Sequence, residues 1–493
     1  MPKSEKRNTP RPKARTPRGL PDLSGSALTR QSAMVDALAR LFASYGFTPL
    51  DTPALEYADA LGRFLPDAER PNEGVFALQD DDEQWLALRY DLTAPLARFV
   101  AAHYDRLPKP FRRFQWGPVW RNEKPGPGRF RQFLQIDADT VGAANMAADA
   151  EMCMMAADAM EALGVPRGDY RVRLNNRKIL DGVLEGVGLT PDTADYDARR
   201  LTVLRAMDKY DRLGLDGVCA LLGAGRRDES GDTTKGAQLD DKQIARIAAL
   251  ISITGDGRGD VLDALADTLG DNERGQEGIA ELREIDTHCA ALGYKADRLA
   301  IDPTIVRGLG YYTGPVFEID LDFDTMDENG KPVRFGSVGG GGRYDDLITR
   351  FKGSSVPATG LSIGISRLAA AWSAQEETDT APLVVVLALD PDRRADYAAL
   401  AQELRAAGIA AECYMGDSGM RAQLRYADVR GARLAVIEGE DERAAGIITI
   451  KDLALGASKS AEIADNAEWR ASGHAQQQFK KDEVVKRIRE ILG

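Results

Sequence analysis

The chain has 493 residues, 43% hydrophobic and 29% charged, and its net charge at pH 7 is −13. This length predicts two to four domains, and the hydrophobic content excludes disorder over the whole chain. The longest aliphatic run, Leu383–Leu389, is far shorter than the ~20 residues that span a bilayer. The N-terminus also lacks an apolar stretch of signal-peptide type, so we expect no membrane contact.

Cysteine and histidine usage argues against several kinds of chemistry. The four cysteines lie far apart without a C-x-x-C pair, which disfavours a zinc ribbon or disulfide scaffold and favours the cytoplasm. None of the three histidines (His103, His288 and His474) stands in an H-E-x-x-H motif, which disfavours a metalloprotease. Residues 1–18 carry seven basic residues and one acidic residue, so residues 1–17 are predicted to form a basic flexible tail.

Local patterns predict the elements of the first 163 residues. Apolar residues at helical spacing predict a helix over 34–45, ended by Gly46. An extended segment, an acidic turn at 80–82, a short strand and a helix over 93–102 are expected to follow. Two strand-like segments flank N-E-K-P-G-P-G, whose Pro and Gly residues predict the loop of a hairpin. A further helix is expected to end near Leu163.

The rest of the chain changes character twice. Residues 176–300 are Ala- and Leu-rich at helical spacing and predict a mainly helical insertion. Strands are expected to resume at Tyr311–Leu321, turn at D-E-N-G-K and continue through the run of glycines, with a helix after Gly364. Beyond a linker at 376–381, strands and helices alternate, which predicts a small α/β domain over 382–493.

The second strand of the predicted hairpin has one polar face. Side chains alternate along a strand, so a polar set shares that face: Arg129, Arg131, Phe133, Gln135, Asp137 and Asp139. Pairing with the preceding strand adds Arg121 to this platform. Arginine forks suit phosphate, whereas a glutamine and a carboxylate suit a small amine or an imidazole. The face therefore predicts a nucleotide beside a polar small molecule.

Several motifs carry a family resemblance over about residues 17–455. FRRFQWGPVWRNEKPGPGRFRQF resembles motif 2 of class II aminoacyl-tRNA synthetases, and ATGLSIGISRLAAA resembles motif 3. LRYDLTAP is similar to the segment of histidyl-tRNA synthetases that holds the α-amino group. VRGLGYYTGPVFE and GGGRYDDL resemble the two histidine-specific motifs of that family, and RGLPDLSG resembles its N-terminal opening.

The resemblance implies an α+β fold, in which helices flank a class II antiparallel sheet and a C-terminal α/β domain binds the anticodon. The implied parts are the tail (1–17), the catalytic domain (18–175 and 301–375), the helical insertion (176–300), the linker (376–381) and the anticodon-binding domain (382–493). Candidate tRNA contacts in the last part are Arg421, Arg425, Arg430 and Lys451. The implied partners are L-histidine, ATP, histidine tRNA and a second copy of the chain in a homodimer.

The resemblance also implies residue roles. Arg121 and Arg307 are expected to be catalytic, one on each side of the ATP α-phosphate. The expected histidine-binding residues are Asp91, Thr93, Arg121, Gln135, Asp139, Arg307, Tyr311 and Tyr312. Among these, Asp91, Thr93 and Gln135 would hold the ammonium group, and Asp139 and Tyr312 would read the imidazole. The expected ATP-binding residues are Arg121, Glu123, Arg129, Phe133 and Arg367. Magnesium would arrive with ATP, and no metal bound tightly by the protein is expected.

Some positions have other interpretations. Thr93 is equally well explained as a helix cap. A less favoured interpretation makes Tyr311 and Tyr312 ordinary strand aromatics. The run Gly339–Gly342 lacks G-x-G-x-x-G spacing and indicates a close backbone approach beside the pocket. Gly310 stands where the family usually has Asp, and the motif 2 loop reads E-K-P-G-P-G-R instead of E-R-P-Q-K-G-R.

Three other functions fit parts of the pattern: a histidine-binding regulatory paralogue, a tRNA-sensing domain, and a class II enzyme for another amino acid. Because Arg121, Gln135 and Arg307 are all present, the first two are disfavoured. The tyrosine pair and Asp139 favour imidazole as the recognised group. The sequence therefore predicts ATP-dependent activation of histidine to histidyl-adenylate and its transfer to the 3′ end of histidine tRNA.

Overall fold

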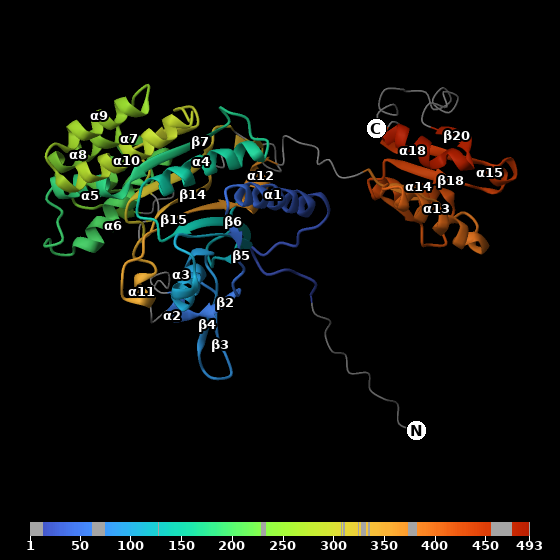
Figure 1. Ribbon diagram of the computed structural model, residues 1–493, viewed down its shortest axis with the longest axis horizontal. Helices are drawn as coiled ribbons and strands as arrows, with labels where there is room; N and C mark the ends of the chain where they lie inside the picture. Colours follow the sequence, from blue (N-terminus) through green and yellow to red (C-terminus); the bar gives the residue numbers. More distant parts are fainter. Residues whose placement is uncertain are drawn as a thin grey trace. The chain divides into compact units, whose positions relative to one another are not determined.

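The computed structural model describes residues 13–61, 74–126, 128–227, 233–306, 308, 311–323, 325–326, 332–333, 336–372, 382–454 and 476–492. The chain forms two compact units, Met1–Glu376 and Glu377–Gly493 (Figure 1). Several predicted features lie outside the described residues: most of the tail, the D-E-N-G-K turn, the linker, Arg307, Gly310 and His474.

An eight-stranded sheet forms the centre of the first unit, in the order β1-β5-β6-β15-β14-β11-β7-β10. Its strands are β1 (Thr48–Pro49), β5 (Phe111–Trp120), β6 (Gln132–Val141), β7 (Tyr170–Asn176), β10 (Leu299–Ile301), β11 (Pro315–Leu321), β14 (Ser337–Arg343) and β15 (Ala358–Gly364). Neighbours from β5 through β7 are antiparallel, and the edge strands β1 and β10 pair in parallel. The predicted antiparallel sheet and β5–β6 hairpin are confirmed.

Helices cover the sheet on both faces. One face packs against α1 (Gly25–Ser44), α4 (Ala147–Ala162) and α12 (Ile365–Trp372), and Phe114, Ile136 and Leu361 of the sheet share one core with them. On the other face, α3 (Thr93–His103) joins a second core with Tyr344 and Val356. Helix α1 begins nine residues before the predicted helix, because its first two turns are mostly exposed and carry little apolar periodicity.

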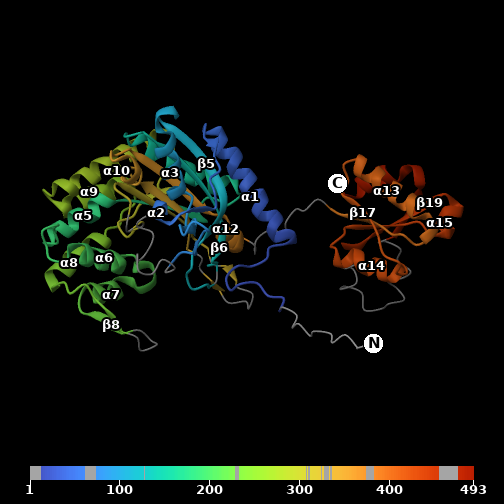
Figure 2. The same ribbon diagram turned by 90° about the horizontal axis from the view of Figure 1, so that it is seen from below.

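A smaller sheet and a group of helices complete the first unit. The sheet has the order β2-β4-β3, with β2 (Leu55–Tyr57), β3 (Ala77–Gln79) and β4 (Trp85–Leu88), beside α2 (Ala58–Leu61). The helices are α5 (Arg177–Gly186), α6 (Tyr196–Met207), α7 (Tyr210–Leu222), α8 (Asp241–Ile251), α9 (Arg258–Leu269) and α10 (Glu273–Ala291), and they lie together at one side of this unit (Figure 2). Short elements are β8 (Gly225–Arg227), β9 (Thr233–Lys235), β12 (Thr325–Met326), β13 (Pro332–Val333) and α11 (Thr349–Lys352).

The second unit is a mixed α/β domain with its own apolar cores. Its sheet has the order β17-β16-β18-β19-β20, parallel in the first three strands and antiparallel in the rest. The elements are β16 (Val384–Val386), α13 (Arg394–Ala406), β17 (Ala411–Cys413), α14 (Met420–Val429), β18 (Leu434–Ile437), α15 (Glu440–Ala445), β19 (Ile447–Asp452), β20 (Gln476–Lys480) and α18 (Val484–Leu492). Across the described parts of both units, every helix is too short or too polar to cross a membrane.

Candidate active site

The candidate site lies on the polar face of β5 and β6. The hairpin register pairs Arg113 with Asp139 and Gly117 with Gln135, and β15 borders β6 on its other side. The alternate residues Phe114 and Ile136 point into the core under α1 and α4. The predicted division of these strands into a polar and an apolar face is confirmed, and the polar face is itself largely buried.

Two buried side chains hold Asp139. Arg113 Nη2 lies 2.8 Å from Asp139 Oδ2 and also donates to the Leu92 carbonyl at 3.0 Å. The Tyr344 hydroxyl donates to Asp139 Oδ1. Burial raises the pKa of Asp139, and the charge of Arg113 opposes that rise. The sequence predicts no role for Arg113 or Tyr344, although alternation along the first strand places Arg113 on the same face as Arg121, and the GGGRYDDL motif contains Tyr344.

Gln135 and Asp137 share one partner across the sheet. Gln135 Nε2 lies 3.0 Å from Ser362 Oγ on β15, whereas Gln135 Oε1 is buried and has no hydrogen-bond partner among the described residues. Ser362 lies directly opposite Asp137 in the register of β15 and β6, and its hydroxyl interacts with the Asp137 carboxylate. Burial, with a further contribution from Asp139, raises the pKa of Asp137 to about 7, against the opposing effects of Arg113 and Ser362.

Asp91 caps helix α3. Its Oδ1 accepts the backbone N–H groups of Thr93 at 3.1 Å and Ala94 at 2.9 Å. The cap is therefore supplied by Asp91, and the alternative interpretation of Thr93 as the capping side chain is wrong. Burial raises the pKa of Asp91, and the helix N–H groups and nearby Arg121 lower it. Asp91 thus both caps α3 and lies beside the polar face.

Arg121 stands at the open end of the hairpin between two aromatic rings. Its Cζ lies 4.4 Å from the Tyr90 ring centroid and 5.2 Å from that of Phe133, both within cation–π range. Its Nε donates to the Tyr90 carbonyl at 3.4 Å. The Tyr90 hydroxyl in turn donates to Glu123 Oε1 at 3.1 Å. The structure thus brings Arg121, Glu123 and Phe133 together, and Phe133 contacts an arginine in addition to any base it would stack on.

The other residues predicted to bind ATP are less tightly held. The exposed Arg129 pairs through its backbone with Gly126, with N–O distances of 2.9 and 3.1 Å. Arg131 steadies the loop, because its Nε donates to the Glu123 carbonyl at 2.9 Å. Arg367 lies in α12, and its Cβ is 3.7 Å from the position that a Cβ on Gly364 would take. Gly364 itself lies opposite Gln135 in the register of β15 and β6.

The tyrosine pair packs on glycine. The ring centroids of Tyr311 and Tyr312 are 4.2 Å apart, and Tyr344 lies 6.2 Å from Tyr311. A Cβ on Gly308 would lie 1.8 Å from the Tyr312 ring, and Gly308 has a φ of +66°, so only glycine fits there. Burial raises the pKa of Tyr311. Tyr344 connects the pair to Asp139, because it lies near Tyr311 and donates to the Asp139 carboxylate. Arg307 lies outside the described residues.

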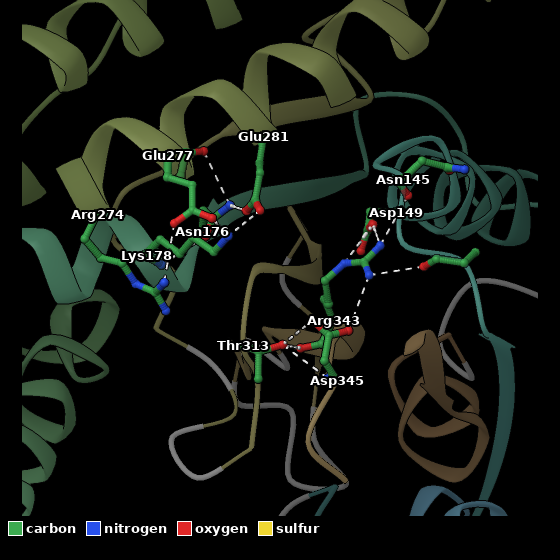
Figure 3. Close-up of polar contacts among 12 residues, drawn as sticks. Asn145, Asp149, Asn176, Lys178, Arg274, Glu277, Glu281, Thr313, Arg343 and Asp345 are labelled. Atoms are coloured by element: carbon green, nitrogen blue, oxygen red, sulfur yellow. Dashed lines mark hydrogen bonds and ion pairs between the residues drawn. The ribbon is translucent and has the colours of Figure 1, made fainter. Parts of the chain in front are cut away.

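The glycine run of β14 permits a close backbone approach, as predicted. A Cβ on Gly341 would lie 1.9 Å from the Gly360 carbonyl oxygen, and one on Gly360 would lie 2.1 Å from Asp139 Oδ1. Just beyond the run, Arg343 forms a buried ion pair with Asp149 of α4 (Figure 3). Thr313 N donates to the Arg343 carbonyl at 2.8 Å, and this contact ties the tyrosine segment to β14.

A second polar cluster fixes the helical segment to the sheet. Asn176, at the end of β7, donates to Glu281 Oε2 of α10 at 2.7 Å, and Lys178 forms ion pairs with Glu277 and Glu281 (Figure 3). These contacts join α10 to the strand that borders β11. Within the described residues, no group of three or more His, Cys, Asp or Glu side chains is arranged to hold a metal ion.

The antiparallel sheet, the hairpin with an arginine after its first strand, and the separate α/β unit together define a class II aminoacyl-tRNA synthetase. The family model described as histidyl-tRNA synthetase matches residues 19–368, and the anticodon binding domain model matches residues 383–491. A histidine–tRNA ligase of Caulobacter vibrioides is 53% identical over 99% of both chains. One of Brucella ovis is 54% identical over 97% of this chain and 96% of its own.

A crystal structure of histidyl-tRNA synthetase from Nostoc sp. PCC 7120 superposes with a TM-score of 0.73 at 29% identity, over 98% of this chain and 100% of that chain. The chain belongs to the histidyl-tRNA synthetase family. Its activity is the ATP-dependent ligation of histidine to tRNA, as the sequence predicts, and the three alternative functions are set aside. Histidine, ATP and tRNA are its partners.

Proposed function

We propose that histidyl-adenylate forms along the polar face of β5 and β6, with the amino acid at the buried end and ATP at the open end. The observation that carries this proposal is the position of Arg121, whose guanidinium stands between Tyr90 and Phe133 at the open end and lies near enough to Asp91 to lower its pKa. A guanidinium there can donate to a carboxylate on one side and a phosphate on the other.

The buried end recognises histidine. A neutral imidazole has one N–H donor and one acceptor nitrogen, so it needs an acceptor and a donor from the protein. The Asp139 carboxylate accepts the ring N–H, and the Tyr312 hydroxyl serves the other nitrogen while Tyr311 shapes the pocket. The ammonium group is held by Asp91, Thr93 and Gln135. The buried Gln135 Oε1, which has no partner among the described residues, can accept a hydrogen bond from it.

The open end carries the reaction. A carboxylate oxygen of histidine attacks the α-phosphorus, the new O–P bond forms, and the bond to pyrophosphate breaks. Arg121 and Arg307 offset the negative charge that develops on the phosphoryl oxygens. Arg129 and Arg367 hold the outer phosphates and the adenine, Phe133 stacks on the base, and Glu123 helps to place the magnesium ion that accompanies ATP.

The two units divide the work on tRNA. We assign the catalytic domain to residues 18–175 and 301–375, around the helical insertion 176–300, and anticodon binding to residues 382–493. Arg421 and Arg425 are exposed on α14, which suits phosphate contacts. Arg430 is a weaker candidate than Arg421 and Arg425, because Glu412 accepts from its Nη2 at 3.0 Å and its Nε at 3.2 Å.

We also propose that the protein works as a homodimer in the cytoplasm. The outer face of the β2-β4-β3 sheet is apolar and exposed: Leu55, Tyr57 and Leu78 are 40%, 56% and 46% accessible, and the register places Tyr57 and Leu78 on either side of Leu86. A second copy would cover this face. Sedimentation of the unaltered chain and of Tyr57→Asp tests this, because a face that is not an interface leaves both with the same mass.

Binding of a sulfamoyl analogue of histidyl-adenylate, measured by calorimetry, tests the proposed site without chemistry. Arg121→Ala and Asp139→Asn are each expected to weaken binding by at least ~10-fold, because each loses a charged hydrogen bond. Arg205→Ala, an exposed arginine on α6, is the matched control and is expected to bind like the unaltered protein. Unchanged affinity in both site variants would overturn the assignment.

A further inference from the structure

The buried end of the site contains a carboxylate, Asp137, to which the proposed reaction gives no role. It lies on β6 between Gln135 and Asp139, is 2% exposed, and its Oδ1 has no hydrogen-bond partner among the described residues. A buried, incompletely paired carboxylate destabilises a fold, so a functional role would explain its presence here. Ser362, which lies opposite Asp137 in the register and interacts with its carboxylate, is also the hydrogen-bond partner of Gln135.

The chemistry of the three groups fixes the direction of the hydrogen bonds. An ionised carboxylate can only accept, so the Ser362 hydroxyl donates its single proton to Asp137. Ser362 Oγ can then only accept from Gln135, which requires the NH₂ group of the amide to face the serine. This argument does not depend on telling nitrogen from oxygen in the amide, and it agrees with the 3.0 Å contact from Gln135 Nε2 to Ser362 Oγ.

The direction of these hydrogen bonds decides whether Gln135 presents its amide oxygen or its NH₂ group to a ligand. With its NH₂ group held by Ser362, the amide turns its oxygen away from the serine as an acceptor, and that oxygen is buried and unpaired among the described residues. An ammonium group has only donors, so it needs this orientation and is repelled by the opposite one. A neutral or absent Asp137 would let Ser362 donate to the amide oxygen and let the amide turn over.

We propose that Asp137 is a positioning residue that, through Ser362, holds the Gln135 amide with its oxygen toward the α-ammonium group of histidine. This inference rests on the proposed role of Gln135 and adds the device that sets its polarity. It also predicts which part of the amino acid Asp137 affects: the ammonium group alone, and neither the imidazole nor ATP.

A role of this kind separates function from stability. The pKa of Asp137 lies above its ordinary value, at about 7, so at pH 8 the ionised side chain lowers the free energy of unfolding. The neutral amide in Asp137→Asn removes that penalty, and the variant should melt at the same temperature as the unaltered protein or higher. A residue that only supported the fold would give a lower melting temperature.

Inhibition of histidine-dependent pyrophosphate exchange at pH 8 tests the proposal with two probes. Histidinol keeps the ammonium group and lacks the carboxylate that reacts, and imidazolepropionate lacks the ammonium group. Asp137→Asn and Ser362→Ala are each expected to weaken inhibition by histidinol about tenfold and to change inhibition by imidazolepropionate and the KM for ATP less than about twofold. The double variant should resemble each single one, because both act by the same route.

Two further variants separate the possible outcomes. Thr140→Val removes a buried hydroxyl from the opposite face of β6 and should leave both inhibitors unaffected. Gln135→Met removes the amide and should weaken histidinol at least as much as Asp137→Asn does. If Gln135→Met has no effect, the proposed role of Gln135 fails. If it weakens histidinol and neither Asp137→Asn nor Ser362→Ala does, or if both inhibitors weaken equally, the positioning role of Asp137 is overturned.

Discussion

The two ends of the hairpin formed by β5 and β6 differ in burial and in how firmly the fold holds their side chains. From Gln135 to Val141, β6 is buried and paired with a strand on both sides, and Arg113 of β5 holds the Asp139 carboxylate. At the other end, Glu123 and Arg129 are exposed, and Arg121 is held mainly by aromatic faces. The amino-acid end is built before the ligand arrives, whereas the nucleotide end leaves its charges for the ligand to pair.

This difference matches what each end must do. Rejecting other amino acids requires polar groups that are costly to leave unpaired, and only a rigid buried site imposes that penalty. Binding ATP and releasing pyrophosphate requires charged groups that can change partners during the reaction. Substitutions at the two ends should therefore affect different kinetic constants.

The largest effect is expected at the open end. Arg121→Ala should lower kcat for histidine-dependent pyrophosphate exchange by at least ~10²-fold, because it removes a donor from the charge that develops at phosphorus. Arg307→Ala is expected to do the same. Arg205→Ala is the matched control, and near-normal exchange in Arg121→Ala would show that the open end is not the reacting centre.

A specific loss of histidine recognition is expected at the buried end. Asp139→Asn should raise the KM for histidine roughly 30-fold and the KM for ATP less than threefold, because the amide cannot replace a charged acceptor for the imidazole N–H. Asparagine is preferred to alanine here because it retains the volume of the side chain beside Arg113. Equal changes in both KM values would indicate a structural role for Asp139 and remove the distinction between the ends.

Removal of the second unit should leave both ends working. A chain that ends after Thr380 is expected to retain most pyrophosphate exchange, while aminoacylation of tRNA falls at least ~10-fold because phosphate contacts to the tRNA are lost. Sedimentation must show the same oligomeric state as the full chain. A truncated protein that charges tRNA as well as the full chain would exclude Glu377–Gly493 as the anticodon reader.

A smaller, pH-dependent effect is expected from Asp137. With a pKa raised to about 7, its carboxylate is ionised at pH 8 and mostly protonated at pH 6.5, where it no longer orients Ser362. The KM for histidine in Asp137→Asn, relative to the unaltered protein, should therefore fall from about tenfold at pH 8 to about threefold at pH 6.5. Titration of free histidine affects the KM of both proteins equally, so it does not change this ratio.

The groups that face Asp137 bear on this measurement. They are Asp139 on the same strand, Arg113 on β5, Ser362 on β15, Asp91 before α3, and Arg89 after β4. Asp139 and Asp91 also have raised pKa values. Both residues are present in Asp137→Asn and in the unaltered protein, so their titration changes the KM for histidine of the two proteins alike and leaves the ratio unchanged. A ratio that stays constant between pH 8 and pH 6.5 would show that the ionisation of Asp137 does not matter.

The sequence predicts features that depend on neighbouring residues and misses those that depend on distant ones. Strand alternation predicts the two faces of β5 and β6 because it is a property of a few consecutive residues. The pairing of Arg113 with Asp139 requires the register between strands, and the partner of Gln135 lies 227 residues away. The cap formed by Asp91 was missed because Thr93, two residues on, gives the same local signal.

Hydrogen–deuterium exchange with and without ATP and histidinol tests the contrast between the ends most directly. Peptides covering Gln135–Val141 are expected to exchange slowly without ligand and to change little on binding. Peptides from the loop between β5 and β6 should exchange quickly at first and slow by at least ~10-fold once both ligands are present. A loop already protected without ligand, or ligand-induced protection that is as large in Gln135–Val141, would contradict a prebuilt amino-acid end and a ligand-completed nucleotide end.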